Sequence, residues 1–340
     1  MQFSSLLQFA QFLDSLGAKP AHVRKVYRAM LCKARWPTRS DRHLPKKLRA
    51  ELQNIRQWWE AIARIHSRHP GWEENSERLL LRLQDGQLIE SVLLPRDGVC
   101  VSTQIGCAVG CKFCMTGRSG LLRQLSDLEI VSQVANACRL RPKTKKVVFM
   151  GMGEPSHNLK NVWSALLFMA QYGEFGYKNL VLSTVGDQRL FDQLLASRIR
   201  PALAISLHTI DEDKRKDLLP KGCRVSVKQL LEFGAQWGKV SGYPVQYEWT
   251  LIAGINDSER EIIQLAEKIK GHYVMVNFIP VNRIPDSPYK RPSREHMQRL
   301  IRLIRSHGVI ATIRDSAAQD VDGGCGQLRA RTLIQKINSD

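Results

Sequence analysis

The sequence predicts an α/β protein with a mainly parallel sheet, and three observations lead to this fold class. The chain has 340 residues and 43% hydrophobic content, so it can bury a full core. From residue 99 onward, short β-rich runs alternate with helical patterns, which is typical of βα units. No internal repeat or low-complexity tract interrupts this alternation. We therefore expect one large α/β domain with a smaller part attached.

Residues 1–75 show apolar residues at intervals of three and four, with a break near Trp36, so we expect a basic helical accessory domain there. The polar stretch 69–76 marks its end. Residues 1–18 hold no basic leader, and no apolar run is long enough to span a membrane. The sequence thus predicts a soluble cytoplasmic protein that has no membrane partner.

A small β-hairpin is expected over residues 76–98. The β-rich runs 78–84 and 87–94 flank Asp85 and Gly86, a dipeptide typical of a two-residue hairpin turn. This hairpin would link the helical domain to the core domain.

The core domain is expected over residues 99–340, with strands and helices in alternation. Strands are predicted over 99–104, 146–150, 179–184, 202–207, 245–251, 274–280 and, late in the chain, 309–314. Helices are predicted over 127–139, 161–171, 227–237, 258–270 and 294–307. Ser126 and Glu129 have the spacing of a capping box at the start of the first helix. Periodicity alone leaves a partial barrel and an open sheet as alternatives, and in both the chemistry belongs at the carboxyl ends of the strands.

The formal net charge is +19, and much of it lies near the N-terminus. Residues 19–49 hold eleven Lys and Arg against the single acid Asp41. Such density suits a phosphate backbone, because neutralising phosphates releases counterions. We expect this segment to contact nucleic acid. A solvated helical face and an anionic membrane surface are the alternatives.

The sequence contains eight cysteines, and three of them fall within eight residues. In a chain of this length without a signal peptide, such clustering favours metal binding or catalysis over structural disulfides. Cys32, Cys138 and Cys223 lie outside any motif, and we interpret them as ordinary thiols.

The three clustered cysteines are Cys107, Cys111 and Cys114, in a loop just after the first strand expected in the core. A structural zinc site normally takes four protein ligands, often from two C-x-x-C pairs, and no second pair exists here. Three thiolates on a four-iron cluster would leave one iron open to a substrate. Zinc or structural thiols remain the alternative.

This C-x3-C-x2-C spacing resembles the radical S-adenosylmethionine (SAM) superfamily. The resemblance implies a 4Fe-4S cluster held by the three cysteines, with SAM chelated at the open iron and cleaved to a 5′-deoxyadenosyl radical. Gly-Met-Gly-Glu-Pro at residues 151–155 is similar to the superfamily's Gly-Glu-Pro motif. Glycine permits close backbone approach, and Glu154 could receive the ammonium group of SAM.

Further motifs, in order along residues 90–328, narrow the resemblance to the RlmN/Cfr adenosine methyltransferases. They are Glu90 in Ile-Glu-Ser-Val, Cys100 in Val-Cys-Val-Ser-Thr-Gln, Ser183 in Leu-Ser-Thr-Val-Gly, Ser206 and His208 in Ser-Leu-His, Asn282 in Ile-Pro-Val-Asn, and Cys325 in Asp-Gly-Gly-Cys-Gly-Gln-Leu. The resemblance implies a partial (β/α)6 barrel of the radical SAM type. It also implies that SAM is contacted by Gly153, Glu154, Ser183, Ser206, His208 and Asn282.

An adenine ring carbon is electrophilic, so direct transfer from a sulfonium does not methylate it. The resemblance implies that Cys325 first accepts a methyl group, which a radical then activates for addition to carbon 2 or carbon 8 of the ring. Cys100 would release the resulting protein-RNA adduct through a transient disulfide. Glu90 resembles the family's proton acceptor. The segment from Glu90 to Cys100 is shorter than the family's common form, so an outward surface glutamate is the alternative.

The resemblance also implies partners: ribosomal or transfer RNA as substrate, and flavodoxin or ferredoxin as electron donor, with the chain acting as a monomer. Two other functions stay open. One is a radical SAM enzyme that modifies a small molecule or peptide, for which Cys325 would be dispensable. The other is a noncatalytic RNA-binding protein that contains zinc or a cluster.

Overall fold

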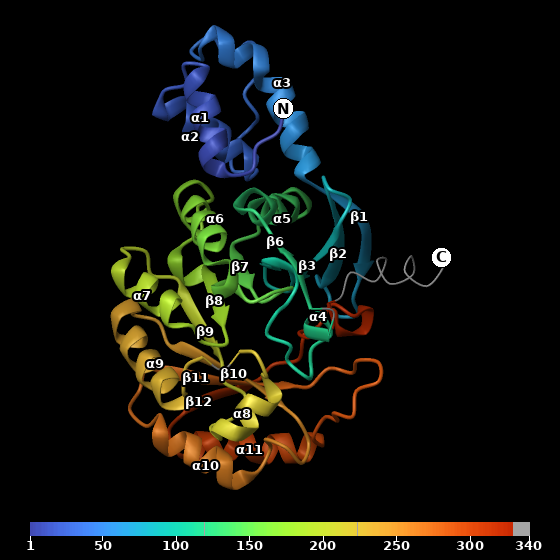
Figure 1. Cartoon of the computed structure of the whole chain (residues 1–340), viewed down its shortest axis with the longest axis vertical. Helices are drawn as coiled ribbons and strands as arrows, with labels where there is room; N and C mark the ends of the chain where they lie inside the picture. The colour runs from blue at the N-terminus through green and yellow to red at the C-terminus, as the bar shows by residue number, and fades with distance from the viewer. Residues whose placement is uncertain (119, 223, 329–340) are drawn as a thin grey trace.

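The computed structural model describes residues 1–118, 120–222 and 224–328 (Figure 1). Three helices form the N-terminal part: α1 (Leu6–Ser15), α2 (Pro20–Met30) and α3 (Lys46–Ile62). The expectation of helix up to residue 75 is wrong, because strand β1 (Ala63–Pro70) begins directly after α3. Its outward side chains alternate with more buried ones, and pairing with the neighbouring strand outweighs local helical spacing.

The predicted hairpin is confirmed as β2 (Glu77–Leu83) and β3 (Leu88–Leu94), which pair antiparallel. It is continuous with the main sheet, because β1 pairs with β2 and β3 pairs with β4 (Gly98–Cys100). The hairpin therefore extends one side of the sheet, next to the strand that ends in Cys100.

The parallel part of the sheet follows the predicted alternation. After β4 its strands are β7 (Lys146–Phe149), β8 (Leu180–Thr184), β9 (Ala202–Ser206), β10 (Val245–Leu251), β11 (Val274–Pro280) and β12 (Ile310–Ile313). Neighbouring strands from β4 to β12 all pair parallel, and the whole order is β1-β2-β3-β4-β7-β8-β9-β10-β11-β12. The sheet is thus open rather than a closed barrel. Short strands β5 (Gln104–Gly106) and β6 (Leu121–Gln124) form a separate pair.

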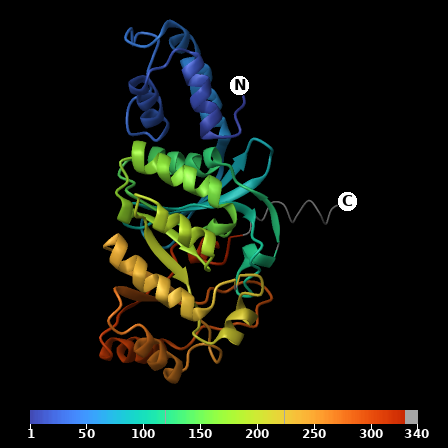
Figure 2. The same cartoon turned by 60° about the vertical axis from the view of Figure 1, so that its left-hand side comes forward.

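Helices lie along the outer side of the curved sheet, as two views of the ribbon show (Figures 1 and 2). They are α5 (Asp127–Leu140), α6 (Leu159–Tyr172), α7 (Gln188–Ala196), α8 (Glu212–Leu218), α9 (Val227–Ser241), α10 (Glu259–Lys268) and α11 (Arg294–Ser306), while the short α4 (Met115–Arg118) follows the cysteine loop. The capping box at Ser126 and Glu129 is confirmed. The short helices α7 and α8 were not predicted, since each offers only about two turns of periodic pattern.

The N-terminal helices and the sheet share one hydrophobic core. Tyr27 on α2 packs its ring against Phe168 and Tyr172 on α6, each with 4.8 Å between ring centroids. The backbone N–H of Leu6 donates to Asp127 Oδ1 at 3.0 Å, which ties α1 to the start of α5. None of the described helices is long and apolar enough to cross a membrane.

Candidate active site

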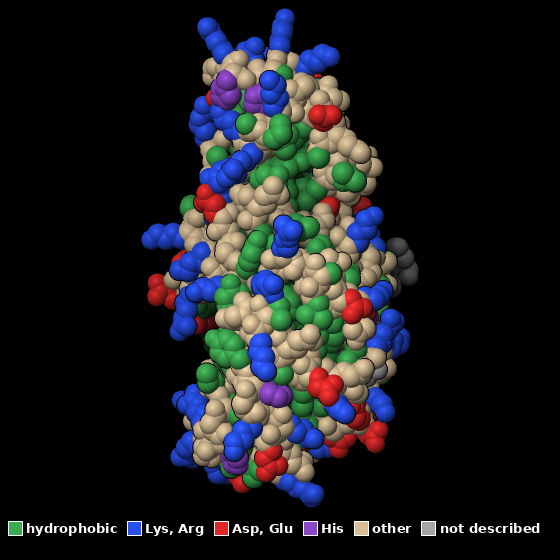
Figure 3. All heavy atoms as spheres, turned by 90° about the vertical axis from the view of Figure 1, so that its left-hand side faces the viewer, with side chains coloured by type: hydrophobic (Ala, Val, Ile, Leu, Met, Phe, Trp, Pro, Cys, Tyr) green, Lys and Arg blue, Asp and Glu red, His purple; other side chains and the backbone are tan. Residues whose placement is uncertain are grey.

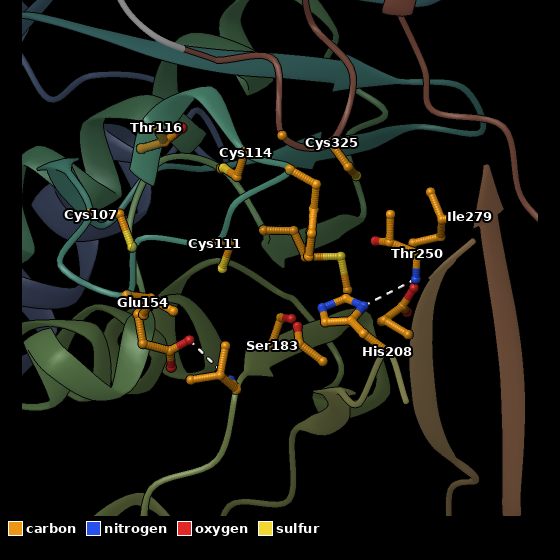
Figure 4. A pocket seen from close by; sticks show the side chains of 18 of the residues that line it. Cys107, Cys111, Cys114, Thr116, Glu154, Ser183, His208, Thr250, Ile279 and Cys325 are labelled. Atoms are coloured by element: carbon orange, nitrogen blue, oxygen red, sulfur yellow. Dashed lines mark hydrogen bonds between the residues drawn. The ribbon is translucent and has the colours of Figure 1, made fainter. Parts of the chain in front are cut away.

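The cysteine loop leaves the carboxyl end of β4 and is closed by short backbone bonds. Cys107 N–H donates to Gly120 O at 2.8 Å, and Cys114 N–H donates to Cys111 O at 3.0 Å. Gly106 turns the chain with φ 79°, and a Cβ there would lie 1.9 Å from Gly120 O, so only glycine fits. The loop brings all three thiols to the wall of one cavity (Figure 4).

The three thiols suit a multi-iron group better than a single ion. A tetrahedral zinc ion would hold its thiolates about 3.8 Å apart. Among the described residues, however, no three His, Cys, Asp or Glu side chains are grouped to hold one metal ion. A cluster binds each thiolate to a different iron and therefore accepts a wider triangle. Burial raises the pKa of Cys107 to about 12 and also raises those of Cys111 and Cys114, so a positively charged group is needed to keep them as thiolates.

The loop after β7 forms a second wall of the cavity. A Cβ on Gly151 would lie 2.7 Å from Val101 O, and one on Gly153, at φ 102°, would lie 2.6 Å from the Gln104 side chain. Glycine at both positions lets this loop pack directly against the segment that leads into the cysteines. The motif therefore has a packing reason as well as a binding one.

The Glu154 carboxylate is already engaged by the protein. It accepts hydrogen bonds from Thr184 Oγ1 at 2.7 Å, from Val185 N–H at 3.0 Å and from Ser156 N–H at 3.0 Å. These bonds tie the loop after β7 to the loop after β8. A carboxylate has about four acceptor positions, so one remains for a ligand. The expected role of receiving an ammonium group is thus joined by a structural one.

Ser183, Ser206 and His208 lie at or just beyond the carboxyl ends of β8 and β9 and line the cavity. His208 adopts φ 63°, and its Nδ1 accepts a hydrogen bond from Thr250 N–H at 3.0 Å (Figure 4). Burial, followed by the charge of Arg215, lowers the pKa of His208 to about 3. The ring is therefore neutral, with its hydrogen on Nε2.

Asn282, just after β11, lines the same cavity and anchors the segment that carries Cys325. Its Nδ2 donates to Cys325 O at 2.9 Å and to Ser316 Oγ at 2.8 Å, while its Oδ1 accepts from Arg291 Nη2 at 2.8 Å. Met115 N–H donates to Gly326 O at 2.7 Å, so the same segment also rests on the cysteine loop. The sequence did not predict this anchoring role.

The two remaining cysteines expected to react lie close together at one end of the cavity. Cys325 is exposed and lines the cavity, whereas Cys100 is buried behind it at the end of β4. Burial, with a smaller contribution from Cys325, raises the pKa of Cys100 to about 12. All cysteines of the described residues are free thiols, with Cys32 exposed and Cys138 buried. Cys223 lies outside the described residues.

Glu90 on β3 is fully buried, so the alternative of an outward surface glutamate is wrong. Arg78 Nη1 donates to its Oε1 at 2.5 Å. Glu90 and Val92 point to the same face of the strand, and Val92 packs with Cys100. Glu90 does not line the cavity, but it lies on the side of the sheet that holds the thiol pair.

Two charged residues of the cavity wall, Glu248 and Arg314, were missed. Glu248 sits on β10 among buried Tyr247 and Trp249, and its Oε1 lies 3.7 Å from Arg314 Nη1. Glu248, and to a lesser extent Cys325 and Cys100, raise the pKa of Arg314. An acid in an otherwise apolar strand was the available signal, since such a residue needs a partner.

The basic N-terminal segment divides into paired and exposed cations. Lys25 and Arg35 both bind Asp41, at 2.9 Å and 2.7 Å, and Arg28 binds Glu174. The exposed cations are Lys19, Arg24, Arg35, Arg39, Arg42, Lys46 and Lys47. Figure 3 shows Lys and Arg side chains projecting from this end of the molecule.

Comparison with known proteins gives three concordant findings. A model of the Radical SAM superfamily matches residues 101–266. The chain is 50% identical over 333 residues to a "Probable RNA methyltransferase" of Ectopseudomonas mendocina (strain ymp), covering 96% of each, and 51% identical over 326 residues to "Probable RNA methyltransferase azo0122" of Azoarcus sp. (strain BH72), covering 95% of this chain and 93% of that one. A radical SAM methyltransferase from Sphaerobacter thermophilus superposes with a TM-score of 0.84 at 32% identity, covering 96% of this chain and 98% of that one.

Proposed function

Because this chain belongs to the radical SAM methyltransferases, which use a 4Fe-4S cluster and SAM, we propose that it methylates an adenine ring carbon of RNA through a methyl group carried on Cys325. The observation that carries this proposal is the shared cavity, with Cys107, Cys111 and Cys114 in one wall and Cys325 at one end. The relatives' name, probable RNA methyltransferase, supports RNA as the substrate. Carbon 2 or carbon 8 of an adenosine in ribosomal or transfer RNA is the proposed target.

The residues around the cavity have separate tasks in this proposal. Cys107, Cys111 and Cys114 would hold the cluster, which when bound supplies the electron for reductive cleavage of SAM. SAM would be contacted by Gly153, Glu154, Ser183, Ser206, His208 and Asn282, all of which line the cavity. Neutral His208 can donate through Nε2 without adding a second positive charge beside the sulfonium.

The thiol pair performs two distinct steps. Cys325 is exposed to the cavity and would accept the methyl group, whereas buried Cys100 would later attack the Cys325 sulfur and release the RNA as a disulfide forms. The raised pKa of Cys100 keeps this thiol protonated, and so inactive, until the adduct changes its surroundings. Glu90, on the same side of the sheet, is the proposed proton acceptor.

The helical part within residues 1–75 would contact the RNA through its exposed cations. The cations paired with Asp41 instead shape the segment between α2 and α3. We further propose that flavodoxin or ferredoxin delivers the electron, that the chain acts as a monomer and that it works in the cytoplasm.

The function is tested with the cluster-loaded full chain, SAM, an electron donor and RNA from a strain that lacks this protein. We expect a methyladenosine in the digested RNA and a methyl group on the peptide that contains Cys325, both detected by mass spectrometry. Cys325→Ala should give neither, while Cys32→Ala, a change at an exposed thiol outside the cavity, should give both. Methylated RNA from Cys325→Ala would contradict the proposal.

A further inference from the structure

Arg314 follows β12 and projects its guanidinium between the two thiols of the cavity. Its backbone N–H donates to Phe278 O at 2.8 Å, which fixes the main chain. Its Nη1 lies 3.7 Å from Glu248 Oε1, and its Nη2 lies 3.6 Å from Met150 Sδ. Arg314, Glu248, Met150 and Cys325 all line the cavity.

The contact with Glu248 leaves the guanidinium free to do more than form an ion pair. Glu248 Oε1 also accepts from Asn277 Nδ2 at 2.9 Å, and Glu248 Oε2 has no hydrogen-bond partner among the described residues. Arg314 is thus held near Glu248 by charge but not locked in a two-bond pair. Guanidinium offers five N–H donors, so several remain for groups inside the cavity.

Both reacting thiols lie within the electrostatic reach of this guanidinium. Cys325 and Cys100 each act on Arg314, and Arg314 in turn acts on Cys100. Met150 contacts Arg314 through its sulfur and Cys100 through its backbone. No other Lys or Arg of the described residues lines this cavity.

We propose that Arg314, anchored by Glu248, is the positioning residue that orients the Cys325 and Cys100 sulfurs for their two steps, an inference that rests on the proposed function. In methyl loading, the Cys325 thiol first gives its proton to water. The sulfur then bonds to the methyl carbon as the bond from that carbon to the sulfonium breaks, and the electron pair leaves with S-adenosylhomocysteine. A guanidinium N–H that donates to the sulfur anion holds it in line for this transfer.

The test compares Arg314→Gln, Arg314→Lys and Glu248→Gln with the control Arg302→Gln, a change at an exposed arginine on α11. Methyl loading of Cys325 is followed by peptide mass in the cluster-loaded chain. We expect Arg314→Gln to load about 10- to 100-fold more slowly, since a hydrogen bond to a charged group is lost. Arg314→Lys should recover at least tenfold over Gln, Glu248→Gln should lie between Gln and wild type, and the control should match wild type.

Two further readouts separate positioning from a purely structural role. SAM affinity and the melting temperature should stay near wild type in Arg314→Lys. With oxidised glutathione, two successive exchanges would form the Cys100–Cys325 disulfide and release two reduced glutathiones, and Arg314→Gln should slow this about tenfold. Equal loading in wild type and Arg314→Gln, or no advantage of Lys over Gln, would overturn the inference. Failure of the wild type to load Cys325 would instead overturn the proposed function.

Discussion

Asn282 is expected to restrain the Cys325 segment, and Asn282→Asp isolates that role. The aspartate keeps an oxygen for Arg291 but loses the Nδ2 donor that binds Cys325 O and Ser316 Oγ. Two hydrogen bonds at about 1 kcal/mol each give about 2 kcal/mol. This corresponds to a roughly 30-fold rise in opening of the segment.

Hydrogen exchange of the backbone amides in residues 316–328 measures this opening directly. We expect about 30-fold faster exchange there in Asn282→Asp, with amides of the parallel strands unchanged. Asn54→Asp, at an exposed position on α3, provides the matched control. Unchanged exchange together with weaker SAM binding in Asn282→Asp would refute this reasoning and assign the amide to the ligand alone.

Three further outcomes are expected. Cys111→Ala should lose the brown colour and SAM cleavage, as iron analysis and product detection would show; full iron content would contradict the ligand assignment. Reversing Arg24, Arg39 and Arg42 to Glu should flatten the salt dependence of RNA binding by up to about 0.7 per lost phosphate contact, whereas three reversals on α11 should not. Because burial lowers the pKa of His208 to about 3, the unfolded chain gains a proton below about pH 6.5 that the folded chain does not. Unfolding free energy should therefore fall from pH 6.5 toward 3, and less steeply in His208→Gln; equal slopes would show that another group is responsible.

The parallel core could be predicted because its signals are local and repeated. The strands β10 and β11 match the predicted ranges at both ends, and the capping box sets the start of α5. The strand expected over 99–104 divides into β4 and β5, because the chain turns out of the sheet to bring in the cysteine loop. β1 was missed because its partner strand, not its own sequence, makes it a strand.

The members of the candidate site could be predicted from their motifs, but not all of their contacts could. The cavity gathers the three loop cysteines with Ser183 and His208, as the motifs suggested. The anchoring bonds of Asn282 depend on a segment more than forty residues away, which no local pattern encodes. The Arg314–Glu248 contact likewise joins β10 to the end of β12 across the sheet.

The most direct test of the central claim uses labelled SAM and RNA with the two thiol variants. Cys100→Ala should load a methyl group on Cys325 and accumulate a covalent protein-RNA species, because the thiol that would release the RNA is missing. Cys325→Ala should form neither, and the double variant should behave like Cys325→Ala. A covalent species that forms without Cys325, or wild-type amounts of methylated RNA from both single variants, would contradict the account.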